Sequence, residues 1–289
     1  MLCIVGTVPR EDFPLVEGEV MREGQHLCIG SQRVDINRGT PALLGAALKA
    51  AEVLNRPAPH ACLVGDTGTG KGSRKLYRHL TKNLPGSAFN TLTFHYLQPI
   101  VYWHNRILTA IDKMTARPCL VADAGFMYLA KMAGEAGAYD LFTPDVGELA
   151  FLADEEAPHP FYTRGFMLHE DNRVPDLIAR AYQHGNTARY LLVKGATDYL
   201  ADADGIMASV DGPSEEVLEA IGGTGDTVTG LVSVLIDSGM DIREAAVAAM
   251  RINRLAGHYA QPTPATQVAD IIEQIPRAWE ELQSVWSQS

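Results

Sequence analysis

Residues 220–238, AIGGTGDTVTGLVSVLIDS, combine a glycine-rich turn, an acid and an amphipathic segment. The apolar residues that follow Asp226 recur at i, i+3, i+4, i+7 and i+8, which predicts a helix that Gly239 is expected to cap. Free N–H groups and the dipole at a helix N-terminus favour an anion. A carboxylate beside that anion suits phosphoryl transfer if Asp226 takes the proton of an attacking hydroxyl. A plain glycine turn with an acidic helix start is the alternative.

A second glycine-rich stretch lies between an expected strand and an expected helix. Gly65, Gly70 and Lys71 match the G-x-x-x-x-G-K pattern of a P-loop. A P-loop needs Ser or Thr directly after the lysine, because that hydroxyl coordinates the magnesium ion of the nucleotide, and Gly72 stands there instead. A P-loop NTPase is therefore a minor alternative. We expect a flexible loop beside the ligand cleft, with Lys71 available to anions.

Polar residues follow two of the expected strands. Asp35 and Asn37 lie in a polar loop between a strand at 27–29 and a helix that begins at Thr40, its expected N-cap. Asp123 ends the buried strand PCLVAD at 118–123. Ligands of α/β sheets bind at this edge, so these three residues are candidates for substrate binding. A solvated loop explains Asp35 and Asn37 equally well.

Glu148 and Lys194 each have a structural and a functional interpretation. Glu148 follows Asp145 by three residues, as in a capping box, which needs no function. Lys194 ends a buried strand and precedes Gly195, so its ammonium group is expected at the edge of the cleft. A surface lysine at the end of a strand is the alternative.

The cysteines and histidines give little indication of a metal centre. His95 and His104 have no cysteine or acidic partner at metal-ligand spacing, so we expect structural or interface histidines. The four cysteines adjoin apolar, strand-like runs and form no C-x-x-C pair. Buried reduced thiols are expected, ahead of disulfides or metal ligands. These cysteines are Cys3, Cys28, Cys62 and Cys119.

The composition narrows the classes of function. The 289 residues include 35 acidic and 24 basic side chains, a net charge of −11, so we expect no nucleic-acid partner. The N-terminus has no basic segment before its short apolar run, and no apolar run approaches the length of a membrane span. We therefore expect a cytoplasmic protein without a membrane partner, organised as one domain over 1–289. The oligomeric state stays open, with a homo-oligomer as one option.

Strand-like and helical segments alternate along most of the chain, which predicts a mostly parallel sheet covered by helices on both faces. The segments 198–201 and 205–210 are separated by a short turn. They predict an antiparallel hairpin at one edge of the sheet. The fold class is therefore α/β.

Four sequence blocks, in this order, resemble the ribokinase-like superfamily: DLFTPDVGELAFL, YLLVKGATDYLADADG, IGGTGDTVTGLVSVLIDSGM and AAVAAMRINRLAGHYA. More narrowly, they resemble the branch that contains ADP- or ATP-dependent NAD(P)H-hydrate dehydratases and carbohydrate-kinase-like relatives. The similarity is strong from Tyr139 to Ala260. It implies a three-layer α/β/α sandwich that binds ATP or ADP, Mg²⁺ and a small-molecule substrate.

The resemblance also assigns roles to residues. It implies that Asp226 is the catalytic acid/base and that the turn before it forms the anion hole, namely Gly223, Thr224 and Gly225. It places Glu148 near the magnesium–phosphate cluster. The residues implied on the nucleotide side are Lys194, Gly195 and Asn253.

The departures from this branch fall on the acceptor side. The G-P-G-L-G segment of the dehydratases has no clear counterpart here, and Asp123 supplies only one acid of their D-A-D-A motif. The acceptor is therefore less defined than the nucleotide chemistry. A sugar or small-alcohol kinase and a non-catalytic nucleotide-binding relative remain alternatives to a dehydratase.

Overall fold

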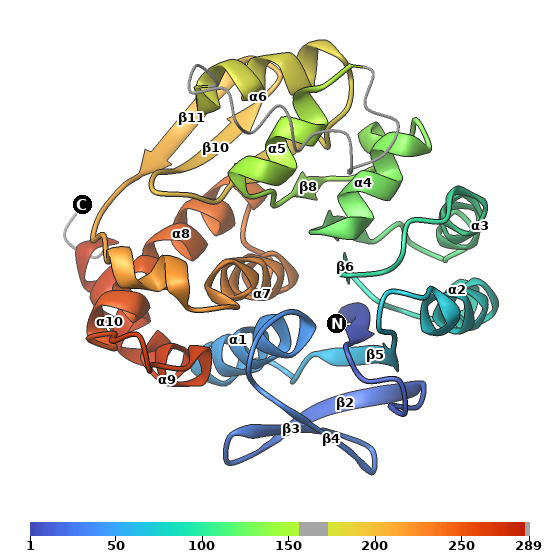
Figure 1. Cartoon of the computed structure of the whole chain (residues 1–289), viewed down its shortest axis with the longest axis horizontal. Helices are drawn as coiled ribbons and strands as arrows, with labels where there is room; N and C mark the ends of the chain where they lie inside the picture. Colours follow the sequence, from blue (N-terminus) through green and yellow to red (C-terminus); the bar gives the residue numbers. More distant parts are fainter. Residues whose placement is uncertain (156–172, 287–289) are drawn as a thin grey trace.

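The computed structural model describes residues 1–155 and 173–286, and their strands form one eleven-stranded sheet (Figure 1). The strand order is β11-β10-β9-β8-β7-β6-β1-β5-β2-β3-β4. The strands from β9 to β5 in this order run parallel to one another, as the alternation of strands and helices predicts. These strands are β9 (Tyr190–Val193), β8 (Leu141–Phe142), β7 (Cys119–Ala122), β6 (Thr91–Phe94), β1 (Leu2–Val8) and β5 (His60–Gly65).

Antiparallel strands flank the parallel part on both sides. The expected hairpin is confirmed as β10 (Asp198–Asp202) and β11 (Gly205–Val210). The other edge consists of β2 (Val16–Glu23), β3 (His26–Ile29) and β4 (Gln32–Asp35). The expectation of a polar loop across β4 was wrong. Because β4 is an edge strand, only Val34 is buried, and its polar composition hides the strand pattern.

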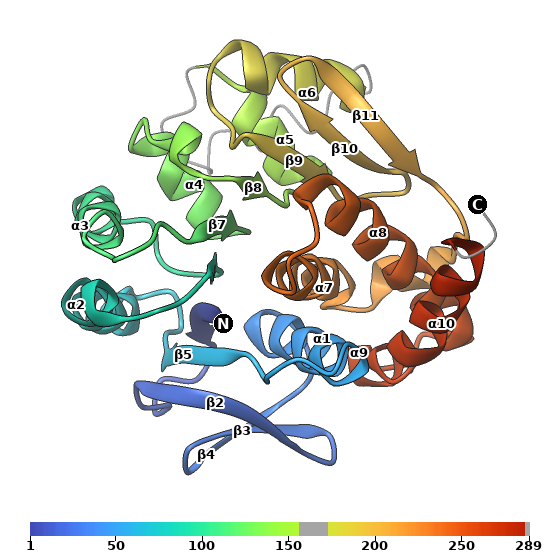
Figure 2. The same ribbon diagram turned by 180° about the vertical axis from the view of Figure 1, so that it is seen from behind.

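Helices cover both faces of the sheet, so the three-layer α/β/α arrangement is confirmed (Figures 1 and 2). One layer consists of α1 (Thr40–Val53), α7 (Thr224–Asp237), α8 (Ile242–Tyr259), α9 (Val268–Ile272) and α10 (Ile275–Trp286). The other consists of α2 (Lys71–Asn83), α3 (Val101–Ile111), α4 (Gly125–Met132), α5 (Val146–Ala153) and α6 (Val174–Gln183). The C-terminal segment 266–286 contains α9 and α10.

The alternation of side chains along β1 divides the interior into two cores. Leu2 and Ile4 pack into the core beneath the α1 layer, whereas Cys3 and Val5 pack into the core beneath the α2 layer. Both faces of a strand are buried when helices lie on each side of a parallel sheet. This explains why the strand is a continuous apolar run without a polar alternation.

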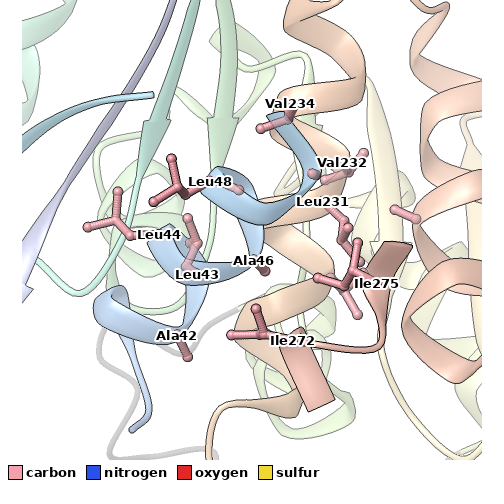
Figure 3. Close-up of a cluster of buried hydrophobic side chains, with 14 of the residues drawn as sticks. Ala42, Leu43, Leu44, Ala46, Leu48, Leu231, Val232, Val234, Ile272 and Ile275 are labelled. Atoms are coloured by element: carbon pink, nitrogen blue, oxygen red, sulfur yellow. The ribbon is translucent and has the colours of Figure 1, made fainter. Parts of the chain in front are cut away.

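Helices α1 and α7 pack closely side by side, as Figure 3 shows for their apolar side chains. Gly230 permits the approach, because a Cβ atom there would lie only 2.2 Å from the Leu43 carbonyl oxygen. Leu43 and Leu231 are fully buried in this layer. Each such side chain contributes about 1.5–3 kcal/mol relative to an exposed one. This contact holds the N-terminal ends of α1 and α7 next to each other.

Helix ends follow the sequence signals only in part. Gly239 has a φ of +99° directly after α7, which confirms the expected glycine cap. At α1 the N-cap is Gly39, not Thr40. Asp241 caps α8 by accepting a hydrogen bond from the Arg243 N–H.

The structure shows the state of the four cysteines. Cys3, Cys28 and Cys62 are buried, Cys119 is partly buried, and all four are free thiols.

Within the described ranges, no helix combines the length and the apolar character that crossing a bilayer requires.

Candidate active site

Three polar side chains meet at the carboxyl edge of the parallel sheet. His95 follows β6, Asp123 follows β7 and Lys194 follows β9. Because β6, β7, β8 and β9 are parallel neighbours, these residues emerge at the same edge. The N-terminal ends of α1 and α7 reach the same place, since Gly39 and Asp226 are hydrogen-bonded there.

Asp226 accepts hydrogen bonds on both carboxylate oxygens. The Gly39 N–H donates to Oδ2 at 2.7 Å, and His95 Nε2 lies 3.0 Å from Oδ1. The carboxylate is 14% exposed, so it is near the surface but mostly shielded from water. Burial raises its pKa, but the hydrogen bond and charge of His95, together with the charge of Lys194 and the Gly39 hydrogen bond, outweigh burial and leave the pKa below its usual value. Asp226 is therefore ionised and fixed in orientation.

His95 is a site residue that the sequence interpretation missed. Its ring is fully buried, and Nδ1 lies 3.0 Å from the Thr40 hydroxyl. An ionised carboxylate only accepts, so Nε2 carries the proton toward Asp226. Its position directly after β6 at the carboxyl edge was the available signal. By contrast, His104 is structural as expected, because it is buried against the Tyr139 hydroxyl at 2.9 Å.

A buried ion pair lies beside Asp226. The Lys194 ammonium group contacts both oxygens of Asp123 at 2.9 and 3.0 Å, and the Thr229 hydroxyl donates to Asp123 at 2.6 Å. Burial lowers the pKa of Lys194, but Asp123, Glu148 and Asp226 together raise it above its usual value. The lysine therefore stays charged, and its interpretation as an isolated surface lysine is wrong.

The turn 222–225, which leads into α7 and includes its first two residues, presents its backbone to this edge. Gly223 is the N-cap with a φ of +101°, a conformation that suits glycine. The N–H groups of Thr224, Gly225 and Asp226 have no hydrogen-bond acceptor among the described residues. The side chain of Lys194 lies alongside Gly225, where an added Cβ would be 3.6 Å from its Cδ atom. The first turn of α7 thus has free donors beside an ammonium group.

Asn253 on α8 braces this turn. Its amide nitrogen donates to the Thr224 carbonyl at 3.2 Å, and its oxygen accepts from the Thr227 hydroxyl at 2.5 Å. The Thr224 hydroxyl donates to the carbonyls of Leu218 and Ile221. The side chains of Thr224 and Asn253 therefore form hydrogen bonds within the protein. The backbone N–H groups of the turn are the donors left for a ligand.

Glu148 forms the capping box that its spacing predicts. Its N–H donates to Asp145, and its Oε2 accepts from the Asp145 N–H at 2.9 Å. Burial and the negative charge of Asp123 raise the pKa of Glu148 to about 8, against the opposing effect of Lys194. A second positive charge near this carboxyl would favour its ionised form.

Gly195 uses its backbone groups within the protein. Its N–H donates to Asp198 at 3.0 Å, and its carbonyl accepts from the Arg254 guanidinium at 2.9 Å. Arg254 also forms a buried ion pair with Asp198 at 2.8 Å. These contacts fix the turn after β9, and they leave no free amide at Gly195 among the described contacts.

Asp35 and Asn37 form their hydrogen bonds with residues outside this cluster. Asp35 is exposed on β4 and pairs with His26 Nδ1 at 2.5 Å. Asn37 is exposed, and its side chain accepts from the Arg38 N–H at 2.7 Å. The structure thus brings Asp123 together with Asp226 and gives Asp35 and Asn37 local partners.

In the loop 65–72, the backbone amides are occupied by a carboxylate of the same loop. Asp66 Oδ1 accepts from the N–H groups of Gly68 and Gly70, and Oδ2 accepts from the Ser73 N–H and hydroxyl. A phosphate on a P-loop would need these donors. The loop is therefore closed by its own acid, which contradicts the P-loop interpretation.

Two of the four non-glycine residues with positive φ in the described structure lie at this edge. Tyr96 and Ala124, which directly follow His95 and Asp123, have φ values of +50° and +51°. Residues other than glycine rarely adopt this region, and such positions cluster at functional sites. The Tyr96 ring is 48% exposed and makes an edge contact with the His95 ring.

Comparison with known proteins identifies an enzyme family that this chain resembles. Residues 103–277 match the sequence model of the carbohydrate kinase family described as NAD(P)H-hydrate dehydratase. An uncharacterized protein of Methanocaldococcus jannaschii is 40% identical over 239 residues, which cover 82% of this chain and 98% of that protein. The ADP-dependent (S)-NAD(P)H-hydrate dehydratase of Cenarchaeum symbiosum is 28% identical over 172 residues, which cover 59% of this chain and only 54% of that enzyme.

Solved structures agree on the fold. A ribokinase-like superfamily protein from Enterococcus faecalis aligns over 97% of this chain and 86% of its own, with a TM-score of 0.60 and 12% identity. At this identity the likeness shows the fold alone. Together with the family match over more than half of the sequence, it shows that the chain belongs to the NAD(P)H-hydrate dehydratase family, enzymes of dehydratase or related small-molecule kinase type on a ribokinase-like fold.

Proposed function

We propose that this enzyme uses ADP or ATP to phosphorylate the hydroxyl of hydrated NAD(P)H and then releases phosphate to restore the nicotinamide ring. One observation carries the proposal: the uncapped first turn of α7 holds free backbone donors, the ionised Asp226 and the neighbouring Lys194 within a single site. Phosphoryl transfer requires chiefly positioning and charge neutralisation, which these groups supply.

The roles follow from the geometry. The N–H groups of Thr224 and Gly225 hold the transferring phosphoryl group at the positive end of the α7 dipole. Asp226 accepts the hydroxyl proton while the hydroxyl oxygen forms a bond to phosphorus and the nucleotide leaves with the electrons of the broken P–O bond. His95 and the Gly39 N–H keep the carboxylate aimed at the acceptor.

The second half of the reaction returns the ring to its reduced, unhydrated form. The C–O bond to phosphate breaks, and the phosphate leaves with the bonding electrons. The neighbouring ring carbon then loses a proton, and its electrons restore the double bond. The net result is NAD(P)H, phosphate and the shortened nucleotide.

The donors at this edge suit a hard divalent cation such as Mg²⁺. Carboxylate oxygens are its preferred protein ligands, and it is usually held by one or two carboxylates together with phosphates and water. The carboxylates of Asp123, Glu148 and Asp226 outnumber the single Lys194 ammonium group here. Glu148 would hold the cation, which would neutralise charge on the phosphates, since the other two acids already have close partners.

On the nucleotide side, we propose that Lys194 contacts the phosphates. Asn253 acts indirectly by fixing the Thr224 carbonyl and so the turn that holds the phosphates. Gly195 contributes space and not a donor, because its N–H is already bonded to Asp198. Asp35 and Asn37, in contrast, would touch substrate only after leaving their present partners.

A sugar or small-alcohol kinase is the second candidate, because the acceptor side lies outside the family match. Gly39, His95 and Tyr96 all precede residue 103, where that match begins. In support of a ring-containing acceptor, the exposed Tyr96 ring lies against His95 and offers a flat aromatic surface next to Asp226.

Two simultaneous readouts separate the candidates. Authentic NADH hydrate is incubated with the enzyme, Mg²⁺ and either ADP or ATP, while NADH absorbance and free phosphate are recorded. The dehydratase proposal predicts equal amounts of NADH and phosphate. Nucleotide consumption with simple alcohols or sugars, and no NADH from hydrate, would instead favour the kinase.

A non-catalytic nucleotide-binding relative makes a different prediction in the same assay. It would bind nucleotide but show no turnover with any acceptor, and Asp226→Asn would change nothing. If Asp226→Asn loses NADH production but still binds nucleotide, the protein is not a non-catalytic nucleotide-binding relative.

A further inference from the structure

A cluster of metal-ligating side chains lies on the α2 face of the sheet, and its residues come from β2, β5 and α2. Antiparallel pairing places Glu17 on β2 opposite Cys62 on β5. His60 is two residues before Cys62, so it projects from the same face of β5. Helix α2 covers this face, and it contributes His79. We call these four residues, Glu17, His60, Cys62 and His79, the thiol–imidazole cluster.

The ligand atoms of the cluster converge on the Glu17 carboxylate. His60 Nε2 lies 3.2 Å from Oε1, and His79 Nε2 lies 2.5 Å from Oε2. One ligand atom each from Glu17, Cys62 and His79 lies within 4.8 Å of the other two. A tetrahedral ion with metal–ligand bonds of about 2.0–2.3 Å holds its ligand atoms about 3.3–3.8 Å apart, so small side-chain rotations would bring these atoms to that spacing.

We propose that the thiol–imidazole cluster binds one divalent transition-metal ion, with Zn²⁺ as the best-fitting ion. A thiolate, two imidazole nitrogens and a carboxylate oxygen are the ligand types that tetrahedral zinc uses, whereas Mg²⁺ and Ca²⁺ prefer oxygen alone. Glu17, Cys62 and His79 would supply three ligands, and His60, whose Nε2 atom contacts Glu17, would supply the fourth, so no coordination position would stay open. The site is therefore structural and distinct from the edge that carries Asp226.

The surroundings suit such an ion. Cys62 is 2% exposed, whereas the side chains of Glu17 and His79 are 34% and 25% exposed, so an ion can enter from their side and reach the thiol. The bound ion would tie the antiparallel extension β2–β4 to β5 and α2.

Two other readings of the cluster serve as outcomes of the test. The first is a set of hydrogen bonds between imidazoles and Glu17 that binds no metal. The second is a pairing of Cys62 with Cys3, whose sulfur atoms are 3.9 Å apart on adjacent strands. Oxidation of these two thiols would remove the proposed sulfur ligand.

The test uses the full-length, untagged chain, reduced and freed of metal by a chelator. Zn²⁺ is added to one sample of this metal-free protein, and its content after dialysis is measured by elemental analysis. Co²⁺ is added to a second metal-free sample as a spectroscopic probe. We expect one ion per chain and a charge-transfer absorption from a cobalt–thiolate bond. The Cys62→Ser variant should lose that absorption.

Matched variants keep the test decisive if Cys62→Ser fails to fold. Glu17→Gln and His79→Ala change partly exposed side chains, and each should weaken Zn²⁺ binding by at least about tenfold. His26→Ala is the control, because His26 forms a similar exposed pair with Asp35 that has no ligating thiol in the described structure. This variant should bind Zn²⁺ as the wild type does.

Three results would overturn the proposal. One is the absence of a cobalt–thiolate absorption in reduced wild-type protein. Another is metal binding that persists in both Glu17→Gln and His79→Ala. The third is a Cys3–Cys62 disulfide in protein purified without reductant together with no metal uptake after reduction. None of these results depends on nucleotide, so they are separate from the outcome of the activity assay.

Discussion

Two glycine-rich turns precede helices in this molecule, and they differ in what their backbone amides contact. In the loop 65–72, the N–H groups before and within the start of α2 donate to the carboxylate of Asp66. In the turn 222–225, the first N–H groups of α7 have no acceptor among the described residues. The first turn is closed by its own anion, whereas the amides of the second have no acceptor among the described residues.

The comparison shows that a glycine motif does not by itself define an anion site. Both turns have glycines with positive φ at the N-cap, Gly70 at +73° and Gly223 at +101°. What separates them is the position of the nearest carboxylate. Asp66 precedes its helix and folds back onto the amides, whereas Asp226 lies inside α7 and points toward Gly39 and His95.

The largest expected effect is that of Asp226→Asn. We expect NADH production to fall by about 10²–10⁴-fold, because an amide cannot take the hydroxyl proton. Nucleotide affinity should change little. Steady-state kinetics and calorimetric nucleotide titration measure the two quantities.

Lys71→Ala is the matched control in the other turn. Since Asp66 already occupies those amides, activity and nucleotide affinity should stay within about twofold of wild type, the scale of a change at an exposed side chain. Loss of nucleotide binding in Lys71→Ala, with little effect in Asp226→Asn, would show that the loop 65–72 holds the nucleotide and the turn 222–225 does not.

The next effect concerns the ion pair beside α7. Lys194→Met leaves the buried Asp123 carboxylate without its cation, which should lower the free energy of unfolding by about 3–5 kcal/mol. The double variant Asp123→Asn/Lys194→Met should recover much of this stability but not activity. Urea unfolding of the single and double variants measures the coupling, and additive losses would contradict a direct pair.

Asp66→Ala should affect stability and leave catalysis almost intact. It removes the acceptor for the N–H groups of Gly70 and Ser73, which should cost about 1–3 kcal/mol. Turnover per folded molecule should remain near the wild-type value. A collapse of turnover in fully folded Asp66→Ala would show that this loop takes part in the reaction.

A separate effect is a change in the pH dependence of stability. The pKa of Glu148 is about 8 in the folded protein, against a reference value of 4.5. Between these two pH values, the folded protein therefore holds a proton that the unfolded chain has lost. The free energy of unfolding should therefore fall as pH rises from about 4.5 to about 8. Glu148→Gln should flatten this slope in urea unfolding at several pH values. Parallel slopes for the two proteins would refute the shifted pKa.

Local patterns in the sequence were sufficient for much of the fold. The helical period after Asp226 and the glycine at 239 predicted α7, and the alternating segments predicted the parallel sheet and the hairpin β10–β11. The capping box of Asp145 and Glu148 also followed from spacing alone. These features depend on residues that are close in sequence.

Features that depend on distant residues were not predictable in this way. His95 and Asp226 are 131 positions apart, and Gly39 and Asp226 are 187 positions apart. Strand β4 was missed because it buries only Val34, and its partner strand decides its conformation. The role of Asp66 was missed because a P-loop pattern records glycines and a lysine and not the acid that occupies their amides.

The central claim is that the turn 222–225, and not the loop 65–72, holds the phosphates. A crystal structure of the Asp226→Asn enzyme with Mg²⁺ and ADP or ATP tests it most directly. The account predicts phosphate oxygens within hydrogen-bond distance of the Thr224 and Gly225 nitrogens. Phosphates bound at Gly68 and Gly70, with Asp66 displaced from these amides, would contradict it.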